Sequence, residues 1–369
     1  METATIGTTA MAPEAKTNWN QVYSLLGLNA AIVISWIAYH NFQPKVLELF
    51  HFQELSFFLV VAQALILVFI PPVAGIVGDY MIKVNGNRFV VFTVGISVTA
   101  MVFMLVAFTV GTATTINLTA ALPVMIVVWL ISMNVFHSPA NSMLEMFAPA
   151  KELPAAMALI VLTTEMLHAL EPVLISFVNW IGPIATFSLG GVLMIVTGYF
   201  FRSTTKETKL VRDHEAVKVE ESKYANVLIA GLFLGVATAI IKNYTPIWFT
   251  AISAAPIFSE SLIVSFILVV SALGAWPLSK FVNRYGTGKS LQYGLIGTFA
   301  CLGILYVVPG TYPFLFICIL TGVSYSFAAV AAFPYALQNL CAKHTTLGAG
   351  MFFGSIELAD GLINILQNS

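Results

Sequence analysis

Charged residues are scarce in this sequence, and their scarcity excludes an ordinary water-soluble fold. Asp, Glu, Lys and Arg make up 9% of the 369 residues, whereas a soluble domain carries roughly 25%. Cysteine is scarce as well: Cys301, Cys318 and Cys341 lie in or beside apolar segments without metal-binding spacing, so we interpret them as packing residues. There is no P-loop, metal-spaced His/Cys cluster or nucleophile elbow. We therefore expect no enzyme, cofactor or metal site. We also expect no nucleic-acid partner, although the net charge of −1 says nothing about this, because the charges are segregated by loop.

What the sequence has in abundance is long apolar runs. Hydrophobic residues make up 59% of the chain, in segments of about 20 residues, the length that a transmembrane helix needs. A membrane β-barrel would instead show short alternating segments. The sequence therefore predicts an all-α polytopic membrane protein with eleven spans, near residues 21–40, 56–78, 89–111, 121–141, 154–177, 182–201, 225–249, 260–282, 290–309, 312–337 and 348–367.

The basic residues predict the orientation of these spans. With the N-terminus in the cytoplasm, fourteen of the sixteen Lys and Arg residues fall in cytoplasmic segments, Lys45 lies on the other side, and Lys242 lies inside a span. The positive-inside rule favours this arrangement, in a multi-pass protein of a cell's inner (plasma) membrane. We expect a cytoplasmic tail at 1–18, a six-helix bundle at 19–202, a cytoplasmic linker at 203–223 and a second bundle at 224–369 with five helices.

The two bundles repeat one another weakly. His40-Asn-Phe-Gln-Pro44 at the end of the first span matches Lys242-Asn-Tyr-Thr-Pro246 in the seventh, and two further pairs of segments match at a similar offset of about 200 residues. Three matches in the same order indicate duplicated halves. The same offset predicts a twelfth span beyond residue 369.

The loop after the second span carries the most specific motif. Gly75-Ile-Val-Gly78-Asp79, followed by Gly86-Asn87-Arg88, is similar to the pattern G-x-x-x-D-R-x-G-R-R/K of the major facilitator superfamily, which two six-span halves and a charged central loop also resemble. The resemblance implies pseudo-symmetric halves around a central cavity, here without the last helix. It also implies that Asp79 and Arg88, with Arg284 in the second copy, latch the halves together on the cytoplasmic side.

The resemblance also implies that spans 1, 4, 7 and 10 line the cavity. Their polar and aromatic side chains suit a small amphipathic ligand, although each could instead bond a neighbouring helix and Lys242 could extend to the membrane interface. The candidate cavity residues are Trp36, Tyr39, His40, Asn134, His137, Lys242, Asn243 and Tyr325.

Acidic residues interrupt two apolar spans at matching depth. Glu165 lies in the fifth span with His168 three residues on, and Glu357 and Asp360 lie in the eleventh. The repeat places Glu165 opposite Ala359, one residue from Asp360. Burial favours the neutral form of a carboxyl group, and such a group can take up and release a proton as the cavity changes sides. We interpret these four residues as proton-coupling candidates; the alternative is a neutral or lysine-paired structural acid.

Together these features predict a secondary active transporter that moves a small organic solute by alternating access. Protons, or else sodium, would drive it, and it would act as a monomer in the lipid bilayer. One alternative is an exporter or flippase of amphipathic compounds or lysolipids, because the stretches around Ser138-Pro139 and Pro334–Gln338 are similar to lysophospholipid-transporter-like and drug-exporter-like members. Sugar:cation symporter-like members have comparable stretches. Another alternative is a non-transporting scaffold or sensor.

Overall fold

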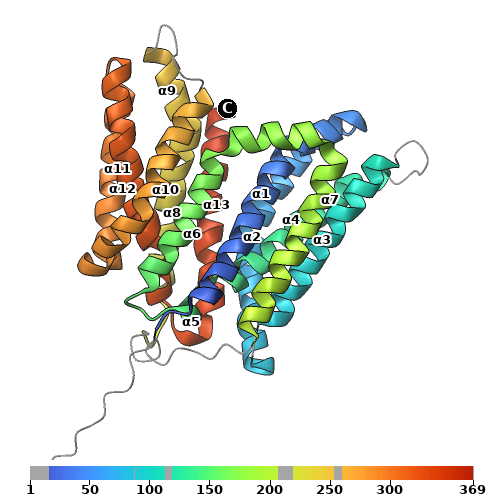
Figure 1. The fold of residues 1–369 in the computed structure, drawn as a ribbon, viewed down its shortest axis with the longest axis horizontal. Coiled ribbons are helices and arrows are strands. Elements are labelled where there is room, and N and C mark those ends of the chain that lie inside the picture. Colours follow the sequence, from blue (N-terminus) through green and yellow to red (C-terminus); the bar gives the residue numbers. More distant parts are fainter. Residues whose placement is uncertain (1–15, 87, 113–118, 207–218, 253–259, 369) are drawn as a thin grey trace, which may run out of the picture.

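The computed structural model describes residues 16–86, 88–112, 119–206, 219–252 and 260–368. Within these ranges the chain is helical and contains no strand (Figure 1), which confirms the predicted fold class. A helix satisfies its own backbone groups, as a chain in hydrocarbon must. The helices are α1 (Trp19–Leu49), α2 (Ser56–Asn85), α3 (Phe89–Gly111), α4 (Leu122–Asn141), α5 (Leu144–Phe147), α6 (Leu153–Ala169), α7 (Glu171–Thr205), α8 (Tyr224–Asn243), α9 (Thr245–Ile252), α10 (Glu260–Tyr285), α11 (Thr287–Val307), α12 (Thr311–Gln338) and α13 (Thr345–Asn368).

The predicted spans all correspond to helices. Nine helices of the described part are long and apolar enough to cross a membrane. The other two are α6, a shorter apolar helix of 17 residues, and α13, which carries Glu357 and Asp360. Of the predicted tail and linker, residues 1–15 and 207–218 lie outside the described residues.

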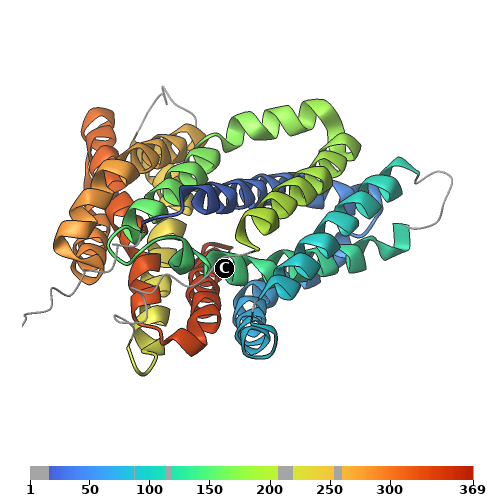
Figure 2. The same ribbon diagram turned by 60° about the horizontal axis from the view of Figure 1, so that its bottom comes forward.

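The helices form two groups that meet along the middle of the molecule (Figures 1 and 2). The first group contains α1–α4 and α7, and the second contains α8–α12. Two helices join the groups: α6 packs against α10, and α13 packs against α2. The contact of α3 with α4 in the first half of the chain matches the contact of α11 with α12 in the second half.

The fifth span ends earlier than the sequence predicted. We expected a helix over 154–177, but α6 ends at Ala169 and a new helix starts at Glu171. Pro172 explains the break, because proline fits the first turn of a helix but not its interior. The segment Glu171–Ile181 then runs across one end of the first group (Figure 1), until Gly182, at φ 82°, turns the chain into the long part of α7.

A polar contact holds this crossing segment in place. Asn179 Oδ1 accepts hydrogen bonds from Asn41 Nδ2 and from Lys45 Nζ, both at 2.8 Å. Lys45 is thus bound at the end of α1 that faces away from most of the basic residues. We call the face that carries Lys83, Arg88, Lys151 and Lys343 the basic face, at the bottom of Figure 1, and the other the opposite face.

Glycines bring α2 and α13 into close contact near the basic face. A Cβ atom added at Gly75 of α2 would lie 2.5 Å from the carbonyl oxygen of Thr346, and one added at Gly350 of α13 would lie 2.1 Å from that of Pro71. Real Cβ atoms do not approach a carbonyl so closely, so any larger residue would push the helices apart. Because these two positions carry no side chain, α2 and α13 pack closely enough to close the molecule on this face.

Substitution Gly350→Ala tests this contact. We expect it to lower the free energy of unfolding by about 1–3 kcal/mol, because the added methyl group overpacks the interface. The measurement is the apparent unfolding temperature in detergent. The matched control is Gly303→Ala in α11, where an added Cβ meets nothing within 4 Å; it should be neutral or stabilising by up to about 1 kcal/mol. Equal effects of the two variants would contradict the proposed close contact.

Candidate functional site

A cavity of about 1180 Å³ lies between the two groups of helices. Its walls come from α1, α2, α4, α6, α8, α10, α12 and α13. Its lining extends to the start of α7 at Glu171, to Pro246 in α9 and to Ser261 at the start of α10, all near the opposite face. The cavity therefore opens toward the opposite face, while the α2–α13 contact closes the basic face.

Glu165 of α6 connects the two groups of helices across this cavity. Its carboxyl group lies close enough to the hydroxyl of Tyr325 on α12 for the two groups to interact electrostatically. That hydroxyl lies 2.8 Å from Thr238 Oγ1 on α8, and Thr238 Oγ1 in turn lies 2.9 Å from the carbonyl oxygen of Leu234. A chain of polar groups thus runs from α6 through α12 to α8.

Lys242 is the central cation of the cavity. It lies one turn beyond Thr238 on α8 and has electrostatic interactions with Glu165, His168, His40 and Glu357. Yet within the described residues its ammonium group makes no hydrogen bond and no ion pair within 4.0 Å. The nearby acids interact with its charge without touching it, and the three N–H donors of its ammonium group are available to a ligand in the cavity.

Aromatic and histidine side chains form the wall on α1 and α4. Trp36 stacks on His40, with ring centroids 5.4 Å apart, and packs edge-on against Trp129 at 5.1 Å. His137 of α4 lies 4.4 Å from the ring of Phe353 on α13. Trp36, His40 and His137 all line the cavity.

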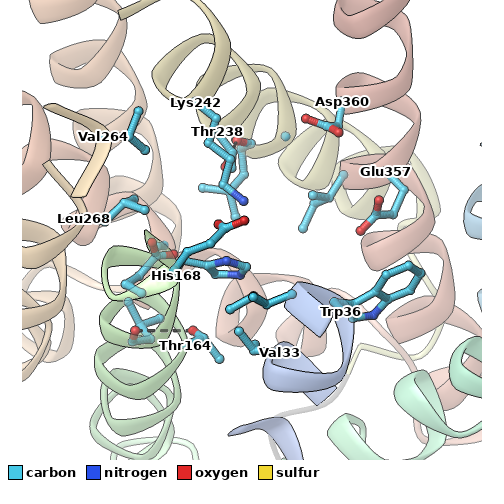
Figure 3. A pocket seen from close by; sticks show the side chains of 18 of the residues that line it. Val33, Trp36, Thr164, His168, Thr238, Lys242, Val264, Leu268, Glu357 and Asp360 are labelled. Carbon is cyan, nitrogen blue, oxygen red and sulfur yellow. Dashed lines mark hydrogen bonds between the residues drawn. The ribbon is translucent and has the colours of Figure 1, made fainter. Parts of the chain in front are cut away.

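Glu357 and Asp360 enter the cavity from α13. They lie three residues apart, on neighbouring turns, and both line the cavity. Figure 3 shows their carboxyl groups on the α13 wall, with Lys242 and His168 on other walls and Trp36 also entering the space. The predicted acidic residues of α6 and α13 therefore share one cavity. Asn243, another candidate, lies in its lining as well.

Two of the predicted cavity residues face elsewhere. Tyr39 is 4% exposed, stacks on Trp129 at 4.5 Å and donates to Gln63 Oε1. Asn134 is 5% exposed and donates to the carbonyl oxygen of Leu130 at 2.8 Å. The structure does not bring these two side chains into the cavity lining, because each helical residue is turned about 100° from the last and these two positions face the packed interior.

Thr238, Asn29 and Asn141 line the cavity as well. Thr238 lies four residues before Lys242, so the helical repeat places it on the same face. Asn29 and Asn141 bond to each other at 3.0 Å near the closed end of the cavity. No sequence signal distinguishes these two asparagines from others that bond across helices.

The latch candidates occupy three different settings. The Asp79 carboxylate accepts the backbone N–H groups of Thr346 at 3.0 Å and Leu347 at 2.8 Å. These groups belong to the first turn of α13, where the helix dipole favours a negative charge. Asp79 therefore ties the first group of helices to α13.

Arg88 and Arg284 do not bind α13 in the same way. Arg88 is buried and donates to Ser142 Oγ at the end of α4, with Glu145 and Asp79 as electrostatic partners. It thus braces the first group of helices from inside. Arg284 is exposed in the last turn of α10. The structure therefore does not bring Arg284 together with Asp79 and Arg88.

A helical bundle with a central cavity open on one face, closed by packed helices on the other, is the arrangement typical of membrane transporters. The family model of the Major Facilitator Superfamily matches residues 22–359. The chain belongs to this superfamily. No curated protein matches the sequence.

Several solved structures share the fold at low sequence identity. They include the major facilitator superfamily transporter FucP, the E. coli fucose:proton symporter, in the outward conformation (13% identity, 94% of this chain and 91% of that chain, TM-score 0.68). The human organic anion transporter MFSD10 (TETRAN) is similar too (10%, 94% and 92%, TM-score 0.67). So is a bacterial homologue of the iron transporter ferroportin in an outward-facing state (11%, 94% and 90%, TM-score 0.67). At these identities the likeness is one of fold.

Substitution Asp79→Asn tests the contact with α13. We expect it to expose the closed end of the cavity to the basic face, because an amide offers one acceptor oxygen and no charge to the two N–H groups. The measurement is labelling of a Met157→Cys reporter, with the native cysteines replaced by serine, by a membrane-impermeant maleimide applied from the basic face of oriented vesicles. The rate should rise severalfold.

The control for that measurement is Glu48→Gln, which removes an exposed carboxyl group at the other end of α1. It should leave the labelling rate unchanged. An unchanged rate in Asp79→Asn would show that the glycine packing alone keeps this face closed.

Proposed function

We propose that this protein is a secondary active transporter that moves a small organic solute by alternating access and couples the movement to protons at Glu165. The basic face lies in the cytoplasm of a cell whose inner (plasma) membrane holds the protein, with the N-terminus on that side. The structure then represents the state that is open to the outside. The position of Glu165 in one cavity with Tyr325 and Lys242 carries this proposal.

The proton count around Tyr325 supports a coupling role for Glu165. The Thr238 hydroxyl has one proton to donate, and so has the Tyr325 hydroxyl. When Thr238 donates to the carbonyl oxygen of Leu234, it can only accept from Tyr325. The Tyr325 hydroxyl then has no proton to offer Glu165, so this arrangement favours the protonated form of Glu165. An ionised Glu165 can accept from Tyr325 only if both hydroxyl groups turn, so its protonation is linked to contacts of α8 and α12.

The positive charge of Lys242 favours loss of the proton from Glu165. Loss of the Glu165 proton creates a carboxylate near the Lys242 ammonium in a site of low dielectric, where the attraction between opposite charges is strong. Glu165 lies on α6, which joins the two groups of helices, and Lys242 lies on α8 of the second group. Each protonation state of Glu165 therefore favours a different contact between the groups, which is what alternating access driven by protons requires.

His168 and the acids of α13 extend this system. His168 follows Glu165 by one turn, and its Nδ1 is buried without a hydrogen-bond partner among the described residues. It can therefore receive a proton from a group that moves toward it. Glu357 interacts with both Asp360 and Lys242, so the acids of α6 and α13 share one cation.

The solved structures fit this proposal without naming the solute. One is described as a fucose:proton symporter, one as an organic anion transporter and one as a homologue of an iron transporter. The same fold thus carries unrelated solutes. The chemistry of the solute has to be read from the cavity of this chain.

Substitution Glu165→Gln tests the coupling role. In proteoliposomes with a proton-sensitive dye inside, a panel of sugars, organic acids, amines and amino acids identifies the solute that moves protons through the unsubstituted protein. We expect Glu165→Gln to lower the uphill accumulation of that solute at least tenfold, because glutamine cannot bind a proton. Exchange of labelled for unlabelled solute should persist, because exchange needs no net proton movement.

Three outcomes would contradict this proposal. Unchanged uphill transport in Glu165→Gln would rule out the coupling role. Movement of labelled lysolipid between leaflets, without any response to the small solutes, would favour the exporter or flippase alternative. No proton or solute flux with any probe would favour a scaffold or sensor. Glu48→Gln is the matched control and should transport normally.

A further inference from the structure

Several uncharged hydrogen-bonding groups of the cavity are already bonded to the protein. Asn29 donates to Asn141 Oδ1 and to the carbonyl oxygen of Leu25, both at 3.0 Å, and Asn141 donates to that of His137 at 3.0 Å. Gln63 Oε1 accepts from Tyr39, and Thr164 donates to the carbonyl oxygen of Ile160. At these groups a neutral polyol would have to displace a bond to gain its own.

Two charged groups of the same cavity, Lys242 and Glu357, are not bonded in this way. Lys242 and Glu357 both line the cavity, on α8 and α13, and within the described residues neither makes a hydrogen bond or an ion pair within 4.0 Å. A charged group in such a site costs free energy unless it is hydrogen-bonded or paired. A donor and an acceptor of full charge thus face one space and leave room for a ligand between them.

The sum of charges restricts the ligand further. Four acids line the cavity (Glu165, Glu171, Glu357 and Asp360), against one lysine, Lys242. An anionic solute would bind Lys242 but add to the acidic excess, and a cationic solute would bind the acids but leave Lys242 without a hydrogen-bond partner. A solute with one group of each sign satisfies both.

From this geometry we infer that the transported solute is a small zwitterion, with a carboxylate that binds Lys242 and an ammonium group that binds Glu357 and its neighbour Asp360. The inference rests on the proposed transport function and names its solute class. The Trp36 indole enters the same space (Figure 3), and its face attracts an ammonium group. The carboxylate competes with Glu165 for Lys242, so binding of the solute favours the protonated form of Glu165. Proton and solute would then be carried together.

Thermal unfolding of the purified full chain in detergent tests the inference. The probes are α-, β- and γ-amino acids, each compared with the amine that lacks its carboxylate and the acid that lacks its ammonium group, for example L-leucine, 3-methylbutylamine and 4-methylpentanoate. L-Fucose and D-glucose serve as neutral probes. We expect at least one zwitterion to raise the unfolding temperature by about 2 °C or more, and its two single-charge analogues to have less than half that effect.

Two substitutions then assign each charge to its partner. In Lys242→Gln the half-saturating concentration of the zwitterion should rise at least tenfold, and its amine analogue should become as effective as the zwitterion, because the carboxylate has lost its partner. In Glu357→Gln the acid analogue should become as effective as the zwitterion. A misfolded variant cannot show this exchange of preference. Glu48→Gln should keep the preference of the unsubstituted chain.

Each contrary result has a definite meaning. Stabilisation by a sugar, an amine or an acid that equals or exceeds that of every zwitterion overturns the inference, and so does the absence of any response to zwitterions. If such a probe still drives proton uptake that depends on Glu165, the proposed transport function stands. If a zwitterion binds as described but Glu165→Gln leaves uphill transport intact, the solute class stands and the proton coupling falls.

Discussion

Burial of charge in a bilayer is the constraint on which this structure depends. A charged side chain at the bilayer centre costs roughly 2.5 kcal/mol or more, so charges gather where water or an opposite charge is at hand. In this protein they gather at the basic face and around one cavity that is open to the opposite face. The cavity holds acids from both halves of the chain around the single lysine that lines it, Lys242. Its charge balance changes whenever a proton or a charged solute enters.

Helix packing can convert this change in the charge of the cavity into a change of conformation. The close contact of α2 with α13 depends on glycines, and Asp79 binds the first turn of α13 through two backbone N–H groups. Such a contact is either formed or broken, because closely packed helices do not stretch gradually. The chain Glu165–Tyr325–Thr238 crosses the same boundary inside the cavity. Events at the carboxyl group and at the latch therefore act on one movement of the two groups of helices.

Much of this architecture could be predicted from the sequence, because long apolar runs and basic loops are unambiguous signals. The runs gave the all-α fold and the eleven spans, and mid-span acids indicated the cavity residues of α6 and α13. The direction of individual side chains could not be predicted: Tyr39 and Trp36 share one helix, but only Trp36 faces the cavity. The crossing segment 171–181 could not be predicted either, because it depends on Pro172, Gly182 and the contact with Lys45. The same holds for the exposed position of Arg284, because tertiary contacts decide such features.

A pair of interspin distances tests the central claim, that the two faces open in alternation, most directly. One pair of labels at Leu49 and Tyr312 spans the opposite face, and another at Val84 and Lys343 spans the basic face; all four side chains are exposed. On a change of pH or addition of solute, the account predicts that the distance across the opposite face shortens while that across the basic face lengthens. Two distances that stay fixed, or that change in the same direction under every condition, would contradict it.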